Sequence, residues 1–389
     1  MDIRQDYFQV YQRSPQWYAY APGRVNLLGE HVDYNEGPVL PAALDMRVEL
    51  AASPSPMEVI SIHAIDFNER AIFSPEDVNS KRDLEGKPLV DWALYPAGVL
   101  WVLLNSGFKV SGMEIAFRSN IPIGAGLSSS AAVEVAFAAL WQAIGHWEMP
   151  RVKLAQLCQE AENNYVGVSC GLMDQFASAC GVKGHALYFD TRSLEWYPVS
   201  LPDEAVIVIV DSGVRRSLLT SEYNERRASC ERAVKLFKQY LPKINSLRDI
   251  SPIEFAAYGD YLPEIERKRA EHVVKEIARV YSAVNALRRR DLQAFGALMY
   301  ASHTSLRDLY EVSHPALDAL VKIARDIPGC FGARLTGAGF GGCTVNMVEK
   351  SKSEEFIQRV TTEYQARSGY QAKAYLCSAG QGANANFLG

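Results

Sequence analysis

The sequence predicts a fold of two domains, each mixing helices and strands in an α+β or α/β arrangement. Three observations support this prediction. The chain has 389 residues, more than one hydrophobic core usually holds together. Both halves contain apolar runs with helical spacing and short runs rich in β-branched residues. Hydrophobic residues make up 48% and charged residues 22% of the chain, which is typical of a globular protein.

The first half alternates short strands with longer helices. The dipeptide Pro22-Gly23 favours a turn, so we expect strands 17–20 and 24–28 on either side of it. Further β-type runs predict strands at 48–52, 59–63, 112–117 and 186–189.

Helical spacing predicts three helices in the same half, at 92–104, 131–144 and 152–166. The helix at 131–144 is apolar on nearly every side, which indicates burial, and Gly145 ends it. The helix at 152–166 carries the acidic residues Glu160 and Glu162.

The second half begins after a turn at residues 201–204. The β-branched run 206–210 suits a strand buried on both faces. We therefore place the domain boundary between residues 203 and 204, which gives domains 1–203 and 204–389. Further helices are expected at 222–240, 265–288, 292–305, 315–326 and 353–367, and strands at 343–348 and 371–377.

Composition excludes several classes of protein. The net charge of −5 argues against nucleic acid as a partner. No apolar run approaches the length that spans a bilayer, and the first twenty residues lack the apolar core of a secretory signal. The seven cysteines are scattered without a CxxC pair, which indicates reduced thiols in the cytoplasm and neither a disulfide framework nor a zinc site.

Residues 22–41 form the most informative segment, PGRVNLLGEHVDYNEGPVLP. It crowds one guanidinium, one imidazole and two carboxylates into ten residues between short apolar runs, at Arg24, Glu30, His31 and Asp33. Burying such groups is costly unless each finds a partner. A ligand with many hydroxyl groups is the natural partner, although a solvated turn after a strand explains the same composition.

A second segment, IPIGAGLSSSAAV at 121–133, places two glycines and three serines before a strong helix. Free N–H groups at a helix N-terminus bind phosphate, and glycines let a ligand approach the backbone. Ser128 also suits a plain N-cap. The segment is neither a Walker A motif nor a dinucleotide fingerprint, because it lacks GK[ST] and the third glycine.

Two shorter segments are weak by themselves. LTGAGFGGC at 335–343 holds four glycines within 337–342, which suits a tight turn or a loop that closes over phosphates. CGLMDQF at 170–176 places Asp174 among apolar residues, where an aspartate is either a structural cap or a catalytic carboxylate.

Taken together and in this order, the four segments resemble the galactokinase family of the GHMP kinase superfamily. The resemblance extends to WALYPAG at 92–98, SEYNERR at 221–227, SHTSLR at 302–307, YEVS at 310–313 and GARLTG at 332–337, so it covers nearly the whole chain. It implies an α+β fold of two domains, an N-terminal one like domain 2 of ribosomal protein S5 and a C-terminal α/β sandwich. The active site is then expected in the cleft between them.

The resemblance also implies an activity, which is transfer of the γ-phosphoryl group of ATP to the anomeric hydroxyl of α-D-galactose. Asp174 is then the catalytic carboxylate beside that hydroxyl, and Arg24 lies next to it. A nearby cation keeps a carboxylate ionised and stabilises charge on the transferring group. Because phosphoryl transfer has a loose transition state, two roles for Asp174 stay open, early proton removal and orientation of the hydroxyl.

The remaining site residues are implied in the same way. The expected sugar contacts are Glu30, His31, Asp33, Gly171 and Tyr223. The expected ATP-binding loop is Gly124, Ala125, Gly126, Leu127, Ser128, Ser129 and Ser130, with Trp92 near the adenine. Ser130 and Glu162 are the expected ligands of Mg²⁺, which prefers oxygen donors. Sugar and ATP are thus the expected partners, and a monomer or a dimer the expected assembly.

The sugar segment departs from the usual family pattern at Val32, Glu36 and Pro38. We expect Val32 to face the core and Glu36 to add negative charge near the pocket mouth. These departures keep related sugars open as substrates, namely N-acetylgalactosamine, galacturonate and arabinose. A non-catalytic sugar sensor is a second alternative, although the uninterrupted run 128–132 and Asp174 favour an enzyme. A kinase of mevalonate or homoserine would not need the hydroxyl partners in EHVDYN.

Overall fold

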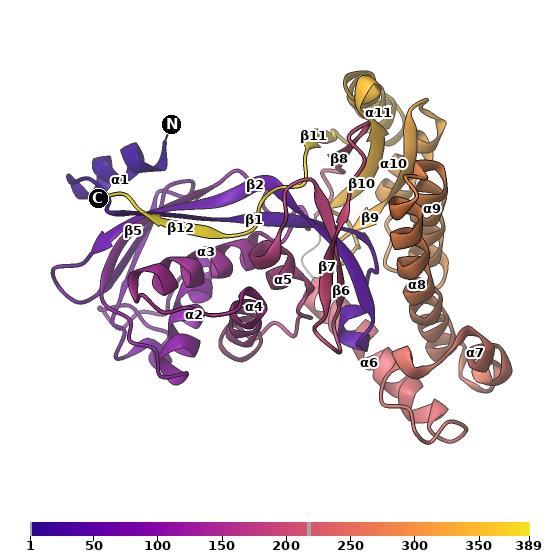
Figure 1. Ribbon diagram of the computed structural model, residues 1–389, viewed down its shortest axis with the longest axis horizontal. Helices are drawn as coiled ribbons and strands as arrows, with labels where there is room; N and C mark the ends of the chain where they lie inside the picture. Colours follow the sequence, from indigo (N-terminus) through magenta and orange to yellow (C-terminus); the bar gives the residue numbers. More distant parts are fainter. Residues whose placement is uncertain (1, 216–218) are drawn as a thin grey trace.

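The computed structural model describes residues 2–215 and 219–389, whose strands form two sheets (Figure 1). In this part of the chain the first sheet has eight strands in the order β12-β1-β2-β5-β3-β4, and β6 pairs with β2 and with β7. Its strands are β1 Trp17–Leu28, β2 Pro38–Pro54, β3 Ile60–Ala64, β4 Glu69–Phe73, β5 Met113–Ser119, β6 His185–Asp190, β7 Trp196–Ser200 and β12 Asn384–Phe387.

The second sheet is antiparallel and has the order β11-β8-β10-β9 across the described residues. Its strands are β8 Ala205–Asp211, β9 Cys330–Thr336, β10 Cys343–Glu349 and β11 Lys373–Cys377. Helices α10 and α11 pack on it through a core that includes Val208, Val210, Leu320 and Phe356. The predicted boundary at residue 203 stays a prediction and falls next to the first residue of β8.

Helices flank both sheets, and Figure 1 shows α2 to α5 along one face of the first sheet and α8 and α9 beside the second. The helices are α1 Ile3–Tyr11, α2 Leu94–Asn105, α3 Ser129–Ile144, α4 Arg151–Glu160, α5 Met173–Cys180, α6 Leu219–Phe237, α7 Pro252–Tyr258, α8 Glu264–Arg288, α9 Leu292–Asp308, α10 Pro315–Asp326 and α11 Ser353–Ser368. Within the part of the chain described here, no helix is both long and apolar enough for a membrane span.

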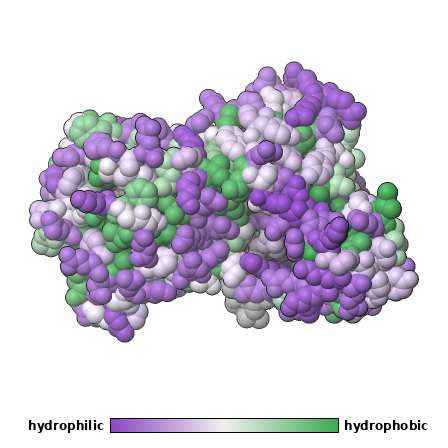
Figure 2. Space-filling model, turned by 60° about the horizontal axis from the view of Figure 1, so that its bottom comes forward, coloured by the Kyte–Doolittle hydropathy of each residue, from purple (hydrophilic) through white to green (hydrophobic). Residues whose placement is uncertain are grey.

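The two halves are joined at several points. β12, close to the C-terminus, returns to pair with β1, so both chain ends lie at the same end of the molecule (Figure 1). Figure 2 shows hydrophilic residues over most of one face, with smaller hydrophobic patches, some of them where the two halves meet. The fold is therefore α+β, as expected.

The expected turn at residues 21–23 is wrong, because β1 runs without interruption from Trp17 to Leu28. The pairing register with β2 shifts between Pro22 and Arg24. A Cβ atom on Gly23 would lie 2.8 Å from the carbonyl oxygen of Leu127. The glycine thus serves a close approach to the serine-containing loop, where a turn was expected.

The expected helix 152–166 is not one α-helix. Helix α4 ends at Glu160 and continues as a π-helical turn, Ala161–Val166. Gly167, with φ of 95°, ends it, and the Tyr165 carbonyl accepts from Lys81 Nζ at 2.5 Å. Single π-helical turns often occur at functional sites, and this one carries Glu162.

Candidate active site

Asp174 and Arg24 form an ion pair. Asp174 lies in the first turn of α5 and Arg24 lies on β1. Arg24 Nε donates to Asp174 Oδ1 at 2.8 Å and Nη2 donates to Oδ2 at 2.9 Å. The Arg24 side chain is 5% exposed and that of Asp174 is 28% exposed, so the carboxylate keeps one open side. A two-point pair of this kind fixes the orientation of a carboxylate.

Ser128 joins the expected ATP-binding loop, residues 124–130, which we call the phosphate loop, to this pair. Its hydroxyl donates to Asp174 Oδ2, and it makes no capping hydrogen bond to α3. Its backbone is left-handed, with φ of 55°. Arg24 adds two contacts to the same loop, from Nη1 to the Gly126 carbonyl at 2.7 Å and from its backbone N–H to the Leu127 carbonyl at 3.1 Å. Ser128 therefore occupies the N-cap position of α3, but its side chain bonds Asp174 and does not cap the helix.

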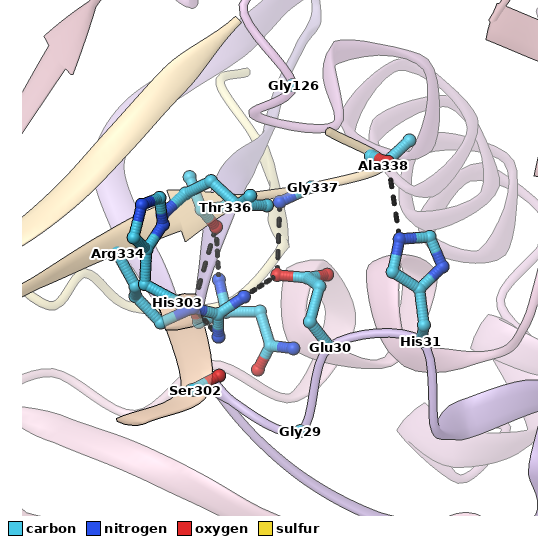
Figure 3. Close-up of polar contacts among 12 residues, drawn as sticks. Gly29, Glu30, His31, Gly126, Ser302, His303, Arg334, Thr336, Gly337 and Ala338 are labelled. Atoms are coloured by element: carbon cyan, nitrogen blue, oxygen red, sulfur yellow. Dashed lines mark hydrogen bonds and ion pairs between the residues drawn. The ribbon is translucent and has the colours of Figure 1, made fainter. Parts of the chain in front are cut away.

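Glu30 lies between the two halves of the molecule (Figure 3). It accepts from Arg334 Nη2 at 2.5 Å and from the Gly337 backbone N–H at 3.1 Å. Burial raises the pKa of Glu30, while the charge of Arg334 opposes that shift. Arg334 on β9 is fully buried, and the sequence analysis gave it no role. The sequence did contain a signal for this pairing, since an arginine inside an apolar strand needs a buried acceptor.

His31 holds the glycine-rich loop that follows β9. Its Nε2 contacts the Ala338 carbonyl at 3.2 Å (Figure 3), and its Nδ1 contacts the Tyr34 hydroxyl at 2.8 Å. The backbone of His31 is left-handed, with φ of 61°, which is uncommon outside glycine. Burial lowers the pKa of His31 to about 3, so its ring is neutral near pH 7.

The Asp33 carboxylate lies directly against Gly171. A Cβ atom on Gly171 would lie 1.8 Å from Asp33 Oδ2, so only glycine fits beside this carboxylate. Burial, followed by the charge of Asp174, raises the pKa of Asp33 to about 7. The ring of Tyr223 lies 5.6 Å from the ring of His31, measured between centroids.

These groups line one cavity of about 200 Å³. All seven residues expected to serve catalysis or sugar binding contribute to it: Arg24, Glu30, His31, Asp33, Gly171, Asp174 and Tyr223. Glu162, Cys170, Met173, Asn224, Gly337 and Ala338 also line it. The cavity thus combines many hydrogen-bonding groups with a few apolar side chains, as expected of a small-molecule site.

The phosphate loop lies beside the glycine-rich loop. A Cβ atom on Gly337 would lie 2.9 Å from the Gly126 carbonyl oxygen, so the two backbones nearly touch. Gly124 and Gly126 line a small cleft with residues 339–342. Arg215, which the sequence analysis did not single out, lies against Gly124 and pairs with Asp211 at 2.6 Å. It places a cation at the edge of this cleft.

A wider, largely apolar cavity of about 410 Å³ lies on the other side of the loop. Ser129, Ser130 and Trp92 line it, with Tyr95 and Phe117. Trp92 therefore lines this cavity and is not buried entirely in the hydrophobic core. The side chains of Ala125 and Leu127 are buried elsewhere, in the core, so only their backbone groups are available to a nucleotide.

Glu162 lines the cavity that also contains Asp174, which is the expected sugar cavity, and belongs to a buried polar cluster. Gln175 Nε2 donates to Glu162 Oε2 at 2.5 Å and to Glu134 Oε2 at 3.0 Å. Burial raises the pKa of Glu162 to about 7, while hydrogen bonds from Cys170, Gln175 and Ser130 oppose that shift.

This cluster fits the coordination habits of Mg²⁺. No group of three or more His, Cys, Asp or Glu side chains suited to a metal occurs in residues 2–215 and 219–389. Mg²⁺ does not need one, since it is usually held by one or two carboxylates together with substrate phosphates and water. The buried Glu162 carboxylate, hydrogen-bonded by Ser130, would supply the protein's share of such a site.

Comparison with known proteins identifies the family. Three family models match the chain: the galactokinase galactose-binding signature at residues 5–54, the GHMP kinase N-terminal domain at 95–182 and the GHMP kinase C-terminal domain at 283–366. A galactokinase of Roseiflexus is 42% identical over 381 residues, covering 98% of this chain and 96% of that protein. The chain belongs to the galactokinase family. A galactokinase of Clostridium beijerinckii is 38% identical and covers 98% of this chain and 97% of its own.

Solved structures agree with this assignment. A Lactococcus lactis galactokinase in complex with galactose matches with a TM-score of 0.93 at 33% identity, over 98% of both chains. A mevalonate kinase of Methanococcus jannaschii matches with a TM-score of 0.65 at 18% identity, over 94% of this chain and 98% of that one, and shows only that the fold is shared.

The departures of this galactokinase family member from the usual pattern lie away from the cavity. Val32 is fully buried in the core, as expected. The expectation for Glu36 is wrong, because its carboxylate pairs with Arg192 at 2.6 Å and does not line the cavity. Glu36 therefore adds no uncompensated charge at the pocket mouth.

Proposed function

We propose that the chain is an ATP-dependent kinase that transfers the γ-phosphoryl group to the anomeric hydroxyl of α-D-galactose. One observation carries the proposal, which is a cavity lined by Asp174, by the hydrogen-bonding groups of Glu30, Asp33 and Tyr223, and by the ring of His31. Membership of the galactokinase family, with its galactose-binding signature, supports the choice of sugar.

The anomeric hydroxyl binds beside Asp174 in this proposal. Arg24 and Ser128 both donate to the carboxylate, which fixes its orientation. Asp174 then accepts a hydrogen bond from the hydroxyl, orients it toward the phosphate loop and takes its proton as the bond to phosphorus forms. Because the transition state is loose, positioning and neutralisation of charge contribute most of the rate.

The sugar's other hydroxyls bind the buried carboxylates. Arg334 and Gly337 already donate to Glu30, so this carboxylate has a fixed position before any ligand arrives. Asp33 lies against Gly171 with no room to move toward it. A site with fixed acceptors leaves them unpaired when an epimer binds, which supports discrimination by the orientation of one hydroxyl.

The loop 124–130 binds the phosphates of ATP, and the apolar cavity beside Trp92 takes the base. Ser130 and Glu162 would hold Mg²⁺, which supplies neutralisation of phosphate charge when it is bound. The hydrogen bond from Gln175 Nε2 holds the Glu162 carboxylate in place. The proposal places the enzyme in the cytoplasm as a monomer, with a dimer as the alternative, and seven free thiols suit a reducing compartment.

A sugar panel tests the proposal. ADP release would be followed with Mg-ATP and galactose, glucose, N-acetylgalactosamine, galacturonate or arabinose, and ³¹P NMR would locate the phosphate on the product. We expect turnover with galactose and phosphate at the anomeric position. Turnover with another sugar alone would contradict the substrate, and binding of galactose without turnover would favour the sugar sensor.

A further inference from the structure

A chain of hydrogen bonds leads from His31 away from the sugar cavity into the core. His31 Nδ1 contacts the Tyr34 hydroxyl at 2.8 Å, which contacts the Tyr310 hydroxyl at 2.8 Å. The Tyr310 hydroxyl contacts the Cys230 thiol at 3.2 Å. Tyr310 and Cys230 are buried, and Cys230 lies on α6, the helix that also carries Tyr223.

The proton positions in this chain follow from its end at Ala338. A backbone carbonyl accepts only, so His31 Nε2 must carry the proton at that contact. In the neutral ring, Nδ1 then has a lone pair and accepts from Tyr34. Each hydroxyl has one proton, so Tyr34 accepts from Tyr310, and Tyr310 accepts from the Cys230 thiol. The chain therefore has one direction, from Cys230 to Ala338.

A second imidazole shows the same arrangement. His272 Nε2 contacts the Glu30 carbonyl at 3.1 Å, and His272 Nδ1 contacts the Ser305 hydroxyl at 2.8 Å. Its ring lies 4.6 Å from that of Tyr310. The backbones of Glu30 and Ala338, which belong to two residues that line the cavity, are thus each held by a histidine whose other nitrogen accepts from a hydroxyl.

We propose that Tyr34 is a positioning residue for the sugar: its hydroxyl donates to His31 Nδ1, holds the ring with Nε2–H against Ala338 and thereby sets sugar affinity. Without this hydroxyl the Nδ1 lone pair is buried and unpaired, which is costly. The Nδ1–H tautomer offers no relief, because its Nδ1–H would also be unpaired and its Nε2 lone pair would face the Ala338 carbonyl. The ring instead loses one of the two hydrogen bonds that fix its orientation, and its contact with Ala338 loosens. His31 and Ala338 both line the cavity, so the shape of the cavity changes when their contact is weakened.

The proposal rests on the function proposed above and predicts a division between kinetic constants. Among the described residues, no hydrogen bond links Tyr34, Tyr310 or Cys230 to the Asp174 and Arg24 pair. Tyr34→Phe should therefore raise the KM for galactose about tenfold, the effect of one lost buried hydrogen bond, and change kcat and the KM for ATP by less than about twofold. Tyr11→Phe is the matched control, since it removes a hydroxyl that bonds the Ser61 carbonyl far from the cavity.

The far end of the chain provides a rescue test. Cys230→Ala removes the donor to Tyr310 and should raise the KM for galactose less than Tyr34→Phe does. Cys230→Ser restores an O–H donor at the same position and should return the KM toward that of the parent protein. Equal effects of the alanine and serine variants would contradict a role of the donated proton.

The tautomer is measured without any substrate. Long-range ¹H–¹⁵N spectra of ¹⁵N-histidine protein resolve the tautomers of the seven histidines, and His31→Asn assigns the signal of interest. We expect the Nε2–H tautomer in both proteins, and a downfield shift of the His31 Nδ1 signal in Tyr34→Phe because its lone pair no longer accepts a hydrogen bond. Nδ1–H in the parent protein, or an unchanged KM in a folded Tyr34→Phe, would overturn the proposal. Absence of galactokinase activity in the parent would instead contradict the proposed function and leave the tautomer result standing.

Discussion

At the scale of single residues, the orientation of Asp174 is the feature on which the proposed mechanism depends. It receives hydrogen bonds from Arg24 on β1 and from Ser128 in the phosphate loop, so three separate segments meet at one carboxylate. This arrangement takes the Arg24 guanidinium out of water, which costs free energy of folding. A catalytic task of Asp174 would explain why the protein bears that cost.

Asp174→Asn tests that task. The amide keeps the shape of the carboxylate and can still accept one hydrogen bond from Arg24, so we expect a folded protein. It cannot take a proton, and kcat should fall by about 10³-fold. ADP release would measure the rate and circular dichroism the fold. Full activity of a folded Asp174→Asn protein would sink the assignment of Asp174.

The contact between Gly171 and Asp33 gives a second prediction. In Gly171→Ala the new Cβ atom, 1.8 Å from Asp33 Oδ2, must displace the carboxylate. We expect kcat/KM for galactose to fall about 100-fold, the effect of misplacing a binding group by about 1 Å. Ser169→Ala, at an exposed neighbouring position, should leave kcat/KM unchanged.

A double variant separates this clash from other effects of the alanine. Gly171→Ala should lower the melting temperature in the parent protein but much less in an Asp33→Ala background, where the obstructing carboxylate is absent. An equal loss in both backgrounds would show that the clash is not the cause.

At the scale of elements, local patterns predicted best where one periodicity dominates a segment. The apolar run 131–144 predicted α3 almost to the residue, and 315–326 predicted α10 with the bounds observed. Prediction failed where a distant contact decides the backbone. The sequence at Pro22-Gly23 indicates a turn, yet the approach of Leu127 from another segment keeps β1 extended.

Candidate site residues show the same division. The polar cluster at 24–33 was visible in the sequence because charged groups stand among apolar ones. Arg334 was not assigned, although it pairs with Glu30, because the two residues lie far apart in the chain. The charge of Glu36 was misjudged for the same reason. Arg192, which lies in the turn after β6, neutralises that charge.

The packing of α9 on β9 gives a prediction for an element. A Cβ atom on Gly296 would lie 1.8 Å from the Phe331 carbonyl oxygen, so Gly296→Ala must push the helix off the strand that carries Arg334. We expect the variant to lose about 3 kcal/mol of unfolding free energy, measured by urea denaturation. Ala297→Ser, one position along on the exposed side of α9, should lose less than about 1 kcal/mol. Similar urea midpoints for both variants would contradict this account of Gly296.

At the scale of the whole molecule, the cavity depends on how the two sheets are joined. The first sheet supplies Arg24, and the segment just after β1 supplies Glu30. β9 of the second sheet supplies Arg334, and the loop after it supplies Gly337 and Ala338. The Glu30 and Arg334 pair, 4% and 0% exposed, therefore connects both halves at the wall of the expected sugar cavity.

Arg334→Met should strand the Glu30 carboxylate in the junction between the halves. Removing one partner of a buried ion pair costs about 3–5 kcal/mol of unfolding free energy. The loss should depend on pH. Burial already raises the pKa of Glu30, and without Arg334 the folded state holds its proton more tightly. Above the ordinary glutamate pKa the unfolded chain releases that proton, so unfolding becomes more favourable as pH rises.

We therefore expect the stability deficit of Arg334→Met, measured by urea denaturation, to be larger at pH 8 than at pH 5. Adding Glu30→Gln removes the buried charge, so the double variant should recover part of the loss at pH 8 and show a deficit that is nearly independent of pH. A deficit in Arg334→Met that is the same at both pH values would mean that lost packing, and not the unpaired carboxylate, limits the junction. In that case Glu30 would have access to water, and its place as a fixed acceptor for the sugar would have to be given up.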